Sequence, residues 1–170
     1  MSSTAVEAHE LARPGLASME LSRGLLSGLV KDLEGEALFK TPCSGGNHAA
    51  WVMGHIAVSE DYFRSTISGT PSLFSEPWGK LFGINSECVA DASKYPSKAE
   101  LAEALERSRA AFVSWASGLD EAGLRKLLPE NLKQFGPDVA GMIAKQAFHE
   151  GFHTGQVSVA RRAQGMARLF

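Results

Sequence analysis

The chain has 170 residues, of which 44% are hydrophobic and 21% are charged. At roughly 150 residues per domain this length fits a single domain, and so large an apolar fraction excludes wholesale disorder. Seventeen Lys and Arg residues nearly balance nineteen Asp and Glu residues, and the net charge is −2. The chain therefore lacks the basic surplus of nucleic-acid and anionic-membrane proteins, and we expect no nucleic acid and no membrane as a partner.

The sequence predicts neither a membrane-spanning helix nor a disulfide framework. The longest uncharged stretch, residues 41–59, contains Pro42, several glycines and two histidines, so it is too polar to cross a bilayer. The N-terminus lacks the basic and then apolar order of a secretory signal. The two cysteines, Cys43 and Cys88, form no CxxC motif. We therefore expect a cytoplasmic protein.

The N-terminal region predicts a tail followed by a helix. Residues 1–14 are polar and end in Arg-Pro, which indicates a loose N-terminal tail and places the single domain over residues 15–170. The first helix is predicted over about residues 16–33, where leucines recur at four-residue steps and form one apolar stripe. These leucines are Leu21, Leu25, Leu29 and Leu33.

A second helix is predicted from Asn47, whose side chain can cap the first turn, to about Ile67. Residues 69–96 contain three prolines and three glycines, which indicates a long irregular segment packed over an end of the domain. A third helix begins at a capping box formed by Ser97 and Glu100, and its apolar seam ends near Gly118.

The fourth helix is predicted to open at Gly136-Pro137 and to continue through His149 and His153 to about Gly165. Residues 124–132, which precede it, leave room for one short helical turn. Four helices of this length with almost no strand signals predict an all-α four-helix bundle.

Two of the five histidines carry a recognisable spacing. His149 and His153 lie four residues apart on the fourth helix, about 40° apart around its axis, so both rings can face one centre. This spacing is typical of half a metal site. A histidine pair at i, i+4 can equally be a solvated or hydrogen-bonded pair without a metal.

Residues 149–153 read H-E-G-F-H and also match the zinc-protease pattern H-E-x-x-H, with Glu150 as the general base. Proteases whose third ligand lies downstream use His, Glu or Asp there, and residues 154–170 contain none of these. We therefore disfavour a protease. Glu150 is turned about 100° from His149, so we expect it to face a neighbouring helix or the rim of the site and not a metal.

A third ligand must come from upstream, and the second helix offers His55 in W-V-M-G-H-I, an apolar setting where an unpaired polar ring would be costly. His48 lies seven residues earlier, about 10 Å along the axis, which is too far for both rings to reach one ion. We interpret His48 as a surface residue of the first turn.

Several residues are candidates for contacts just outside the ligands. Gln156 lies on the stripe of the fourth-helix histidines, where its amide could orient a ligand imidazole, touch a substrate or form an interhelix hydrogen bond. Trp51 and Tyr62 share the face of the predicted third ligand and are further candidates for this outer layer or for substrate contact. Trp51, Phe148 and Phe152 also fit a role in the core. We assign no catalytic residue.

The chain resembles the DinB-like, or DinB/YfiT-like, metal-binding four-helix bundles. The resemblance extends from S-R-G-L-L through N-H-A-A-W-V-M-G-H-I-A, P-W-G-K-L-F-G and Y-P-S-K-A-E-L to F-H-E-G-F-H-T-G-Q-V, which is most of the chain. Its most specific part is W-x-x-G-H combined with H-x-x-x-H-x-G-Q. Members that keep this part hold a divalent metal, commonly nickel or zinc, with three histidines, which match His55, His149 and His153.

The resemblance also implies an arrangement and a range of activities. It implies an up-down-down-up bundle with a long crossover between helices two and three, and frequent homodimers. Characterised relatives include transferases and isomerases that use low-molecular-weight thiols such as bacillithiol, mycothiol or glutathione. Many other members have no known activity, and the family name does not imply DNA contact.

The leading hypothesis is a metal-dependent enzyme of thiol S-transferase or hydrolase type that acts on a small molecule, with an open coordination position activating thiol or water. Nickel or zinc is the expected metal, and iron and manganese also suit three nitrogen ligands. The alternative is a non-catalytic metal-binding or stress-related interaction module. An apo bundle with vestigial histidines is a third reading.

Overall fold

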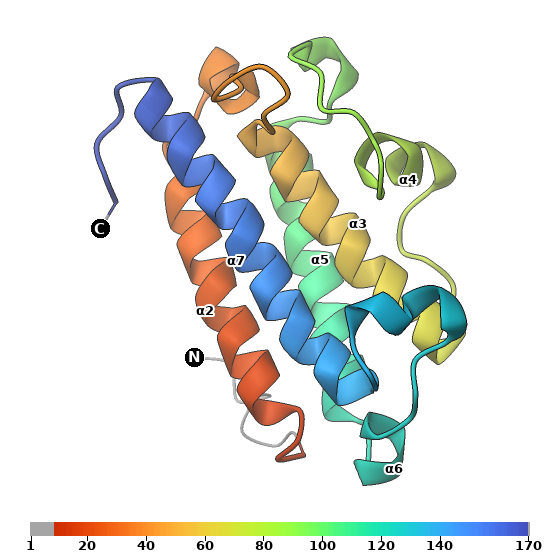
Figure 1. The fold of residues 1–170 in the computed structure, drawn as a ribbon. Helices are drawn as coiled ribbons and strands as arrows, with labels where there is room; N and C mark the ends of the chain where they lie inside the picture. Colours follow the sequence, from red (N-terminus) through yellow and green to blue (C-terminus); the bar gives the residue numbers. More distant parts are fainter. Residues whose placement is uncertain (1–8, 170) are drawn as a thin grey trace.

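The structure, a computed structural model, describes residues 9–169. Its four long helices are α2 (Arg13–Val30), α3 (Ala49–Ser68), α5 (Lys98–Ser117) and α7 (Val139–Ala163). In Figure 1, α2 and α7 run from the lower to the upper end of the bundle, whereas α3 and α5 run from the upper to the lower end. No strand is assigned within residues 9–169, where Leu127 and Asp138 form one isolated bridge. The predicted all-α fold is confirmed.

Short elements connect the long helices. They are η1 (Gly35–Phe39), α4 (Glu76–Phe82), η2 (Ala92–Lys94), α6 (Glu121–Leu124) and η3 (Glu130–Phe135). The predicted long connection between the second and third long helices is present, and it contains α4 and η2. Figure 1 shows α4 beside α3. No helix of the described part of the chain has the length and apolarity of a membrane span.

Helix α2 begins earlier than predicted. Arg13 and Pro14 form its first turn, a position where proline is tolerated because the first N–H groups of a helix have no intrahelical partner. Ala12, just before the helix, is fully buried and joins the core. Residues 13 and 14 of the predicted tail therefore belong to the first helix, and residues 1–8 of the tail lie outside the described part of the chain.

The buried face of α2 also differs from the predicted leucine stripe. Of the predicted stripe, Leu29 and Leu33 are buried, whereas Leu21 is 67% exposed and Leu25 is only partly buried. A series of four-residue steps drifts by about 40° per step, because a turn has 3.6 residues, and so leaves the buried face. The buried residues alternate three- and four-residue steps instead. They include Leu16, Met19, Arg23, Leu26 and Val30.

The cap of α3 is His48 and not Asn47. Nδ1 of His48 accepts a hydrogen bond from the backbone N–H of Trp51 at 3.1 Å, and the helix begins at Ala49. The expectation that His48 lies on the surface is wrong, because its ring is fully buried between Phe39 and Tyr95. Burial lowers the pKa of His48, so the neutral ring keeps the lone pair that the cap requires.

The starts of α5 and α7 follow their capping residues. The capping box of Ser97 and Glu100 is confirmed, and α5 ends at Ser117, beside the predicted Gly118. Helix α7 begins at Val139, slightly later than Gly136-Pro137, because the side chain of Asp138 accepts the backbone N–H of Gly141 at 2.8 Å and caps the first turn.

The bundle has two apolar core clusters with a polar layer between them. Helix α2 packs mainly on α7, and α3 packs mainly on α5. One cluster includes Leu26, Met53, Ile56, Leu105 and Val157, and the other includes Met19, Phe63, Phe112, Ile143 and Ala147. Four charged side chains, three of them buried and Arg109 partly buried, separate the clusters along the long helices. They are Arg23, Glu60, Arg109 and Glu150.

Candidate metal centre

Three histidines from two helices of the bundle come together. His55 of α3 faces His149 and His153 of α7, and one ring nitrogen of each lies within 4.8 Å of the others. The Nε2 atoms of His55 and His149 are 3.1 Å apart. His55 and His153 are buried, and His149 is half-buried. The predicted convergence of these three residues is confirmed, while metal ligation stays a prediction.

Two of the rings are oriented through their Nδ1 atoms. Nδ1 of His55 donates to the carbonyl oxygen of Phe82 at 2.7 Å, and Nδ1 of His153 donates to Oε1 of Gln156 at 2.8 Å. These oxygens can only accept, so the proton sits on Nδ1 of both rings. The Nε2 lone pairs are then available to a cation, which is the usual way that proteins orient histidine ligands.

Burial keeps the rings neutral. Burial, together with a smaller contribution from the neighbouring histidines, lowers the pKa of His55 to about 4 and that of His149 to about 3. Burial also lowers the pKa of His153. Neutral imidazole is the form that binds metal, so at neutral pH no proton has to be displaced from the three rings.

Trp51 and Gln156 lie where the sequence places them, but Tyr62 does not. The indole ring of Trp51 stacks on the imidazole of His55, with ring centroids 4.4 Å apart and planes 11° apart. Tyr62 is 40% exposed, and its described contacts are with Phe63 and Asn131, neither of which belongs to the histidine cluster. Two further turns of α3 carry Tyr62 away from the level of the histidines.

Sequence reasoning missed the backbone support of His55. A backbone carbonyl such as that of Phe82 cannot be recognised from the sequence. The glycine of the motif W-x-x-G-H is nevertheless an indirect sign of it. A Cβ on Gly54 would lie 2.3–2.5 Å from atoms of the Phe82 ring, so only glycine lets this ring pack against α3. Phe82 is fully buried there, which places its carbonyl oxygen at His55.

A cavity of about 580 Å³ opens next to the centre. Its wall includes Cys43, Asn47, Phe152, Gln156 and Arg162. Gln156 lies in this wall and also accepts the hydrogen bond of the His153 ring, and Nδ2 of Asn47 donates to the same Oε1 at 3.1 Å. The cavity and the histidine cluster therefore share one side chain.

Phe148 and Phe152 are not core residues, because they are 63% and 58% exposed. The two cysteines are free thiols, as predicted from their spacing. Burial raises the pKa of the Cys88 thiol, which disfavours its reactive thiolate form. Cys43 is exposed and lies in the cavity wall.

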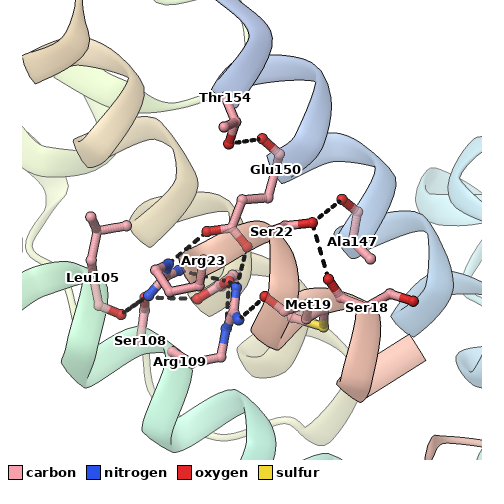
Figure 2. Close-up of polar contacts among 11 residues, drawn as sticks. Ser18, Met19, Ser22, Arg23, Leu105, Ser108, Arg109, Ala147, Glu150 and Thr154 are labelled. Carbon is pink, nitrogen blue, oxygen red and sulfur yellow. Dashed lines mark hydrogen bonds and ion pairs between the residues drawn. The ribbon is translucent and has the colours of Figure 1, made fainter. Parts of the chain in front are cut away.

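Glu150 turns away from the histidines, as predicted. Its carboxylate contacts Arg23 and Arg109 in the interior of the bundle, and Figure 2 shows this network. It is 1% exposed and fully engaged by these arginines, so it is not placed as the general base of an H-E-x-x-H protease.

A family model described as the DinB superfamily matches residues 18–157. The match covers most of the chain and includes the three histidines. The chain belongs to the DinB superfamily. This confirms the family predicted from W-x-x-G-H and H-x-x-x-H-x-G-Q. A search of curated proteins finds no match to this chain.

Proposed function

We propose that this DinB-superfamily chain binds a divalent metal ion through His55, His149 and His153 and acts on a small molecule as a thiol S-transferase or a hydrolase. The observation that carries the proposal is the convergence of three neutral imidazoles, two of them with Nδ1 already engaged. The DinB resemblance favours nickel or zinc as the metal, and an all-nitrogen donor set is also compatible with iron and manganese.

The donor set favours a catalytic centre over a closed structural one. Within residues 9–169, the cluster contains three potential ligands and no fourth His, Cys, Asp or Glu. Structural zinc sites normally have four protein ligands, whereas catalytic sites have three and keep a position open. A divalent ion bound here would supply a Lewis acid that favours hydroxide or thiolate at that position.

The residues beside the centre fit a small-molecule substrate. The cavity brings an aromatic ring, Phe152, and a cation, Arg162, next to the amides of Asn47 and Gln156. A low-molecular-weight thiol that carries a carboxylate can use all three kinds of group. In an S-transfer, the thiol gives its proton to water, its sulfur bonds to the electrophilic carbon, and the leaving group departs with the electron pair of the bond that breaks.

Metal binding is tested by elemental analysis of tag-free protein. Wild type is expected to contain close to one divalent ion per chain, and His55→Ala and His153→Ala are expected to lose it. His9→Ala is the matched control, because His9 lies outside the cluster and bonds locally to the backbone N–H of Leu11. Protein that stays metal-free after reloading with nickel and zinc salts would refute the proposal.

Turnover is tested on the metal-loaded protein with glutathione plus 1-chloro-2,4-dinitrobenzene for S-transfer and with 4-nitrophenyl acetate for hydrolysis. We expect a rate that depends on metal and is lost in His153→Ala. If the protein binds metal but neither turns over these substrates nor binds thiol, the second candidate is favoured. That candidate is a non-catalytic metal-binding or stress-related module. Relaxation of solvent water by the Mn²⁺-loaded protein separates the two, because an exchangeable water requires an open position.

We also propose that the chain forms a homodimer. Phe148 and Phe152 stack on the outer face of α7 with ring centroids 6.4 Å apart, and exposed aromatic pairs of this kind commonly mark interfaces. Sedimentation should give a dimer for wild type and a monomer for a variant with both residues changed to Ser. Leu127→Ser is the control, because Leu127 is 73% exposed in a different part of the surface.

A further inference from the structure

We propose that Arg23 and Arg109 are positioning residues of the metal centre, because they bridge Glu60 of α3 and Glu150 of α7 and so fix the two helices that carry the histidines. This inference rests on the metal binding proposed above. It assigns a role to the buried charged network, which the histidine cluster itself does not explain.

Each arginine contacts both carboxylates, and Figure 2 shows the two arginines with Glu150. Nε of Arg23 lies 2.6 Å from Oε1 of Glu150, and its Nη2 lies 3.1 Å from Oε1 of Glu60. Nη2 of Arg109 lies 2.5 Å from Oε1 of Glu60 and 2.5 Å from Oε2 of Glu150. Helix α3 is therefore connected to α7 twice through a planar guanidinium group, whose fixed fork of donors imposes a geometry.

The arginines are themselves anchored. Nη1 of Arg23, on α2, donates to the carbonyl of Leu105 on α5 at 2.8 Å, and Nη1 of Arg109, on α5, donates to the carbonyl of Met19 on α2 at 2.6 Å. Ser108 of α5 donates to Glu60 at 2.9 Å. These reciprocal bonds join α2 to α5, and the two bridged carboxylates attach α3 and α7 to that pair.

The position of the network makes it relevant to the histidines. Glu150 follows His149 directly, and Glu60 lies five residues after His55, about 7.5 Å along α3. Because α3 packs mainly on α5 and α7 mainly on α2, the separation of α3 and α7 depends on links between the two pairs. The guanidinium bridges are such links, and on α7 they attach at Glu150, which stands in the sequence between two of the candidate ligands.

The charges balance within a buried layer. Two arginines face two glutamates, and the Arg23, Glu60 and Glu150 residues are 8%, 2% and 1% exposed. Although burial opposes the charge of Arg109, Glu60 and Glu150 raise the pKa of its guanidinium. An apolar layer of similar volume can stabilise a fold equally well, so directional bridges imply a positional role.

The test compares Co²⁺ binding to variants of the full chain at a temperature where each is folded. Glu150→Gln and Glu60→Gln are expected to raise the Co²⁺ dissociation constant about tenfold or more and to change the d–d absorption bands, because the histidines no longer meet at the same geometry. Asp61→Asn is the matched control. Asp61 is equally buried on α3, but it pairs with Arg64 and with the loop at Ser72.

Asp61→Asn is expected to lower thermal stability while it leaves Co²⁺ affinity within twofold of wild type and the spectrum unchanged. If a glutamine variant does not fold, Arg109→Lys replaces it, because lysine keeps the charge but offers a single nitrogen to the two carboxylates. It should weaken Co²⁺ binding about fivefold or more. Wild-type affinity and spectrum in the bridging variants would overturn the inference alone, whereas a wild type that binds no more Co²⁺ than His55→Ala would overturn the proposed metal site as well.

Discussion

At the residue scale, the candidate centre depends on side chains and backbone groups that sit one step behind the histidines. The carbonyl of Phe82 and the amide of Gln156 each accept the Nδ1 proton of one ring. An imidazole that can rotate or exchange its tautomer loses orientation entropy when a metal binds, so fixed Nδ1 partners raise affinity without touching the ion. This reasoning gives a direct test at Gln156.

Gln156→Leu removes the acceptor of the His153 Nδ1 proton while it keeps a similar volume. We expect metal affinity to fall by about tenfold, the lower end of the effect of losing such a partner. Gln156→Glu restores an acceptor at the same place and should bind at least as tightly as wild type. Competition of each variant with a chromophoric zinc chelator measures the affinities. Equal affinities for Leu and Gln would show that Gln156 does not act through His153.

Gly54→Ala tests the close packing of Phe82 on α3. The new Cβ would lie 2.3–2.5 Å from atoms of a fully buried ring, so the ring and its carbonyl must move. We expect the free energy of unfolding to fall by about 1–3 kcal/mol, as for other overpacked positions, and metal affinity to fall as well. Urea unfolding and zinc titration provide the two measurements.

Gly79→Ala serves as the control for this change. Gly79 lies in α4, and nothing stands within 4 Å of a Cβ built on it. Alanine is favoured over glycine in helices, so this variant should be neutral or slightly more stable. If Gly54→Ala behaves in the same way, the contact with Phe82 does not constrain the site.

Site residues could be predicted where the evidence for them lies within a single helix. His149 and His153 could be paired from spacing alone, and His55 from its apolar neighbours, because helical periodicity fixes direction within one element. The carbonyl of Phe82 could not be predicted, because a backbone acceptor leaves no mark in the sequence. Tyr62 was misplaced because sharing a face of a helix does not mean sharing a level along its axis.

At the element scale, helix starts are set by individual capping groups, and α3 has an unusual one. His48 caps its first turn as a neutral, buried imidazole. Sequence rules favour Asn, Asp, Ser and Thr at this position, so they selected Asn47. The structure places the amide of Asn47 on Gln156 instead.

This cap predicts a pH dependence of stability. Burial holds the pKa of His48 below its ordinary value of 6.5, so below pH 6.5 the unfolded chain takes up a proton that the folded chain does not. The stability that this group contributes is therefore complete above pH 6.5 and is lost as pH falls. One such group contributes up to about 1.4 kcal/mol per pH unit.

His48→Asn keeps a capping acceptor but removes the titration. Urea unfolding of metal-free wild type and variant at pH 7.5 and 5.5 should show that wild type loses about 1 kcal/mol more on acidification. The cost of the smaller side chain is the same at both pH values and cancels in this difference. An equal loss in both proteins would mean that His48 is protonated in the fold.

The extent of the elements was predictable where caps and periodicity agreed. The capping box of Ser97 and Glu100 marked the start of α5, and α7 was found through both histidines. The buried face of α2 was predicted incorrectly because only the spacing of its leucines was considered. The buried Arg23 occupies a core position on the inner face of this helix. A charged residue inside a bundle is hidden from any pattern that equates charge with surface.

At the scale of the whole molecule, the polar layer is the feature that sequence reasoning had least access to. Arg23, Glu60, Arg109 and Glu150 lie on four different helices, and each alone is typical of a solvated face. Only the packed bundle brings them together, between two apolar clusters. The histidines lie on the side of the larger cluster, which includes Trp51, so a metal there would join α3 to α7 in a second place.

A metal that joins α3 to α7 should stabilise the whole fold, because it binds the folded chain and not the separated helices. At a free metal concentration 100-fold above the dissociation constant, linkage gives about 2.7 kcal/mol. For a domain of this size that corresponds to a rise in Tm of about 5–10 °C. Scanning calorimetry of wild type with EDTA and with zinc measures the shift.

His149→Ala decides whether this shift comes from the histidine centre. The variant should melt at the same temperature with EDTA and with zinc, since two imidazoles alone bind the ion too weakly. His9→Ala should retain the full shift, because His9 lies outside the cluster. A rise in Tm that survives in His149→Ala would place the stabilising ion elsewhere on the chain. If the zinc-induced rise in Tm is lost in His149→Ala and kept in His9→Ala, metal binding at the histidines is coupled to the folding of the bundle.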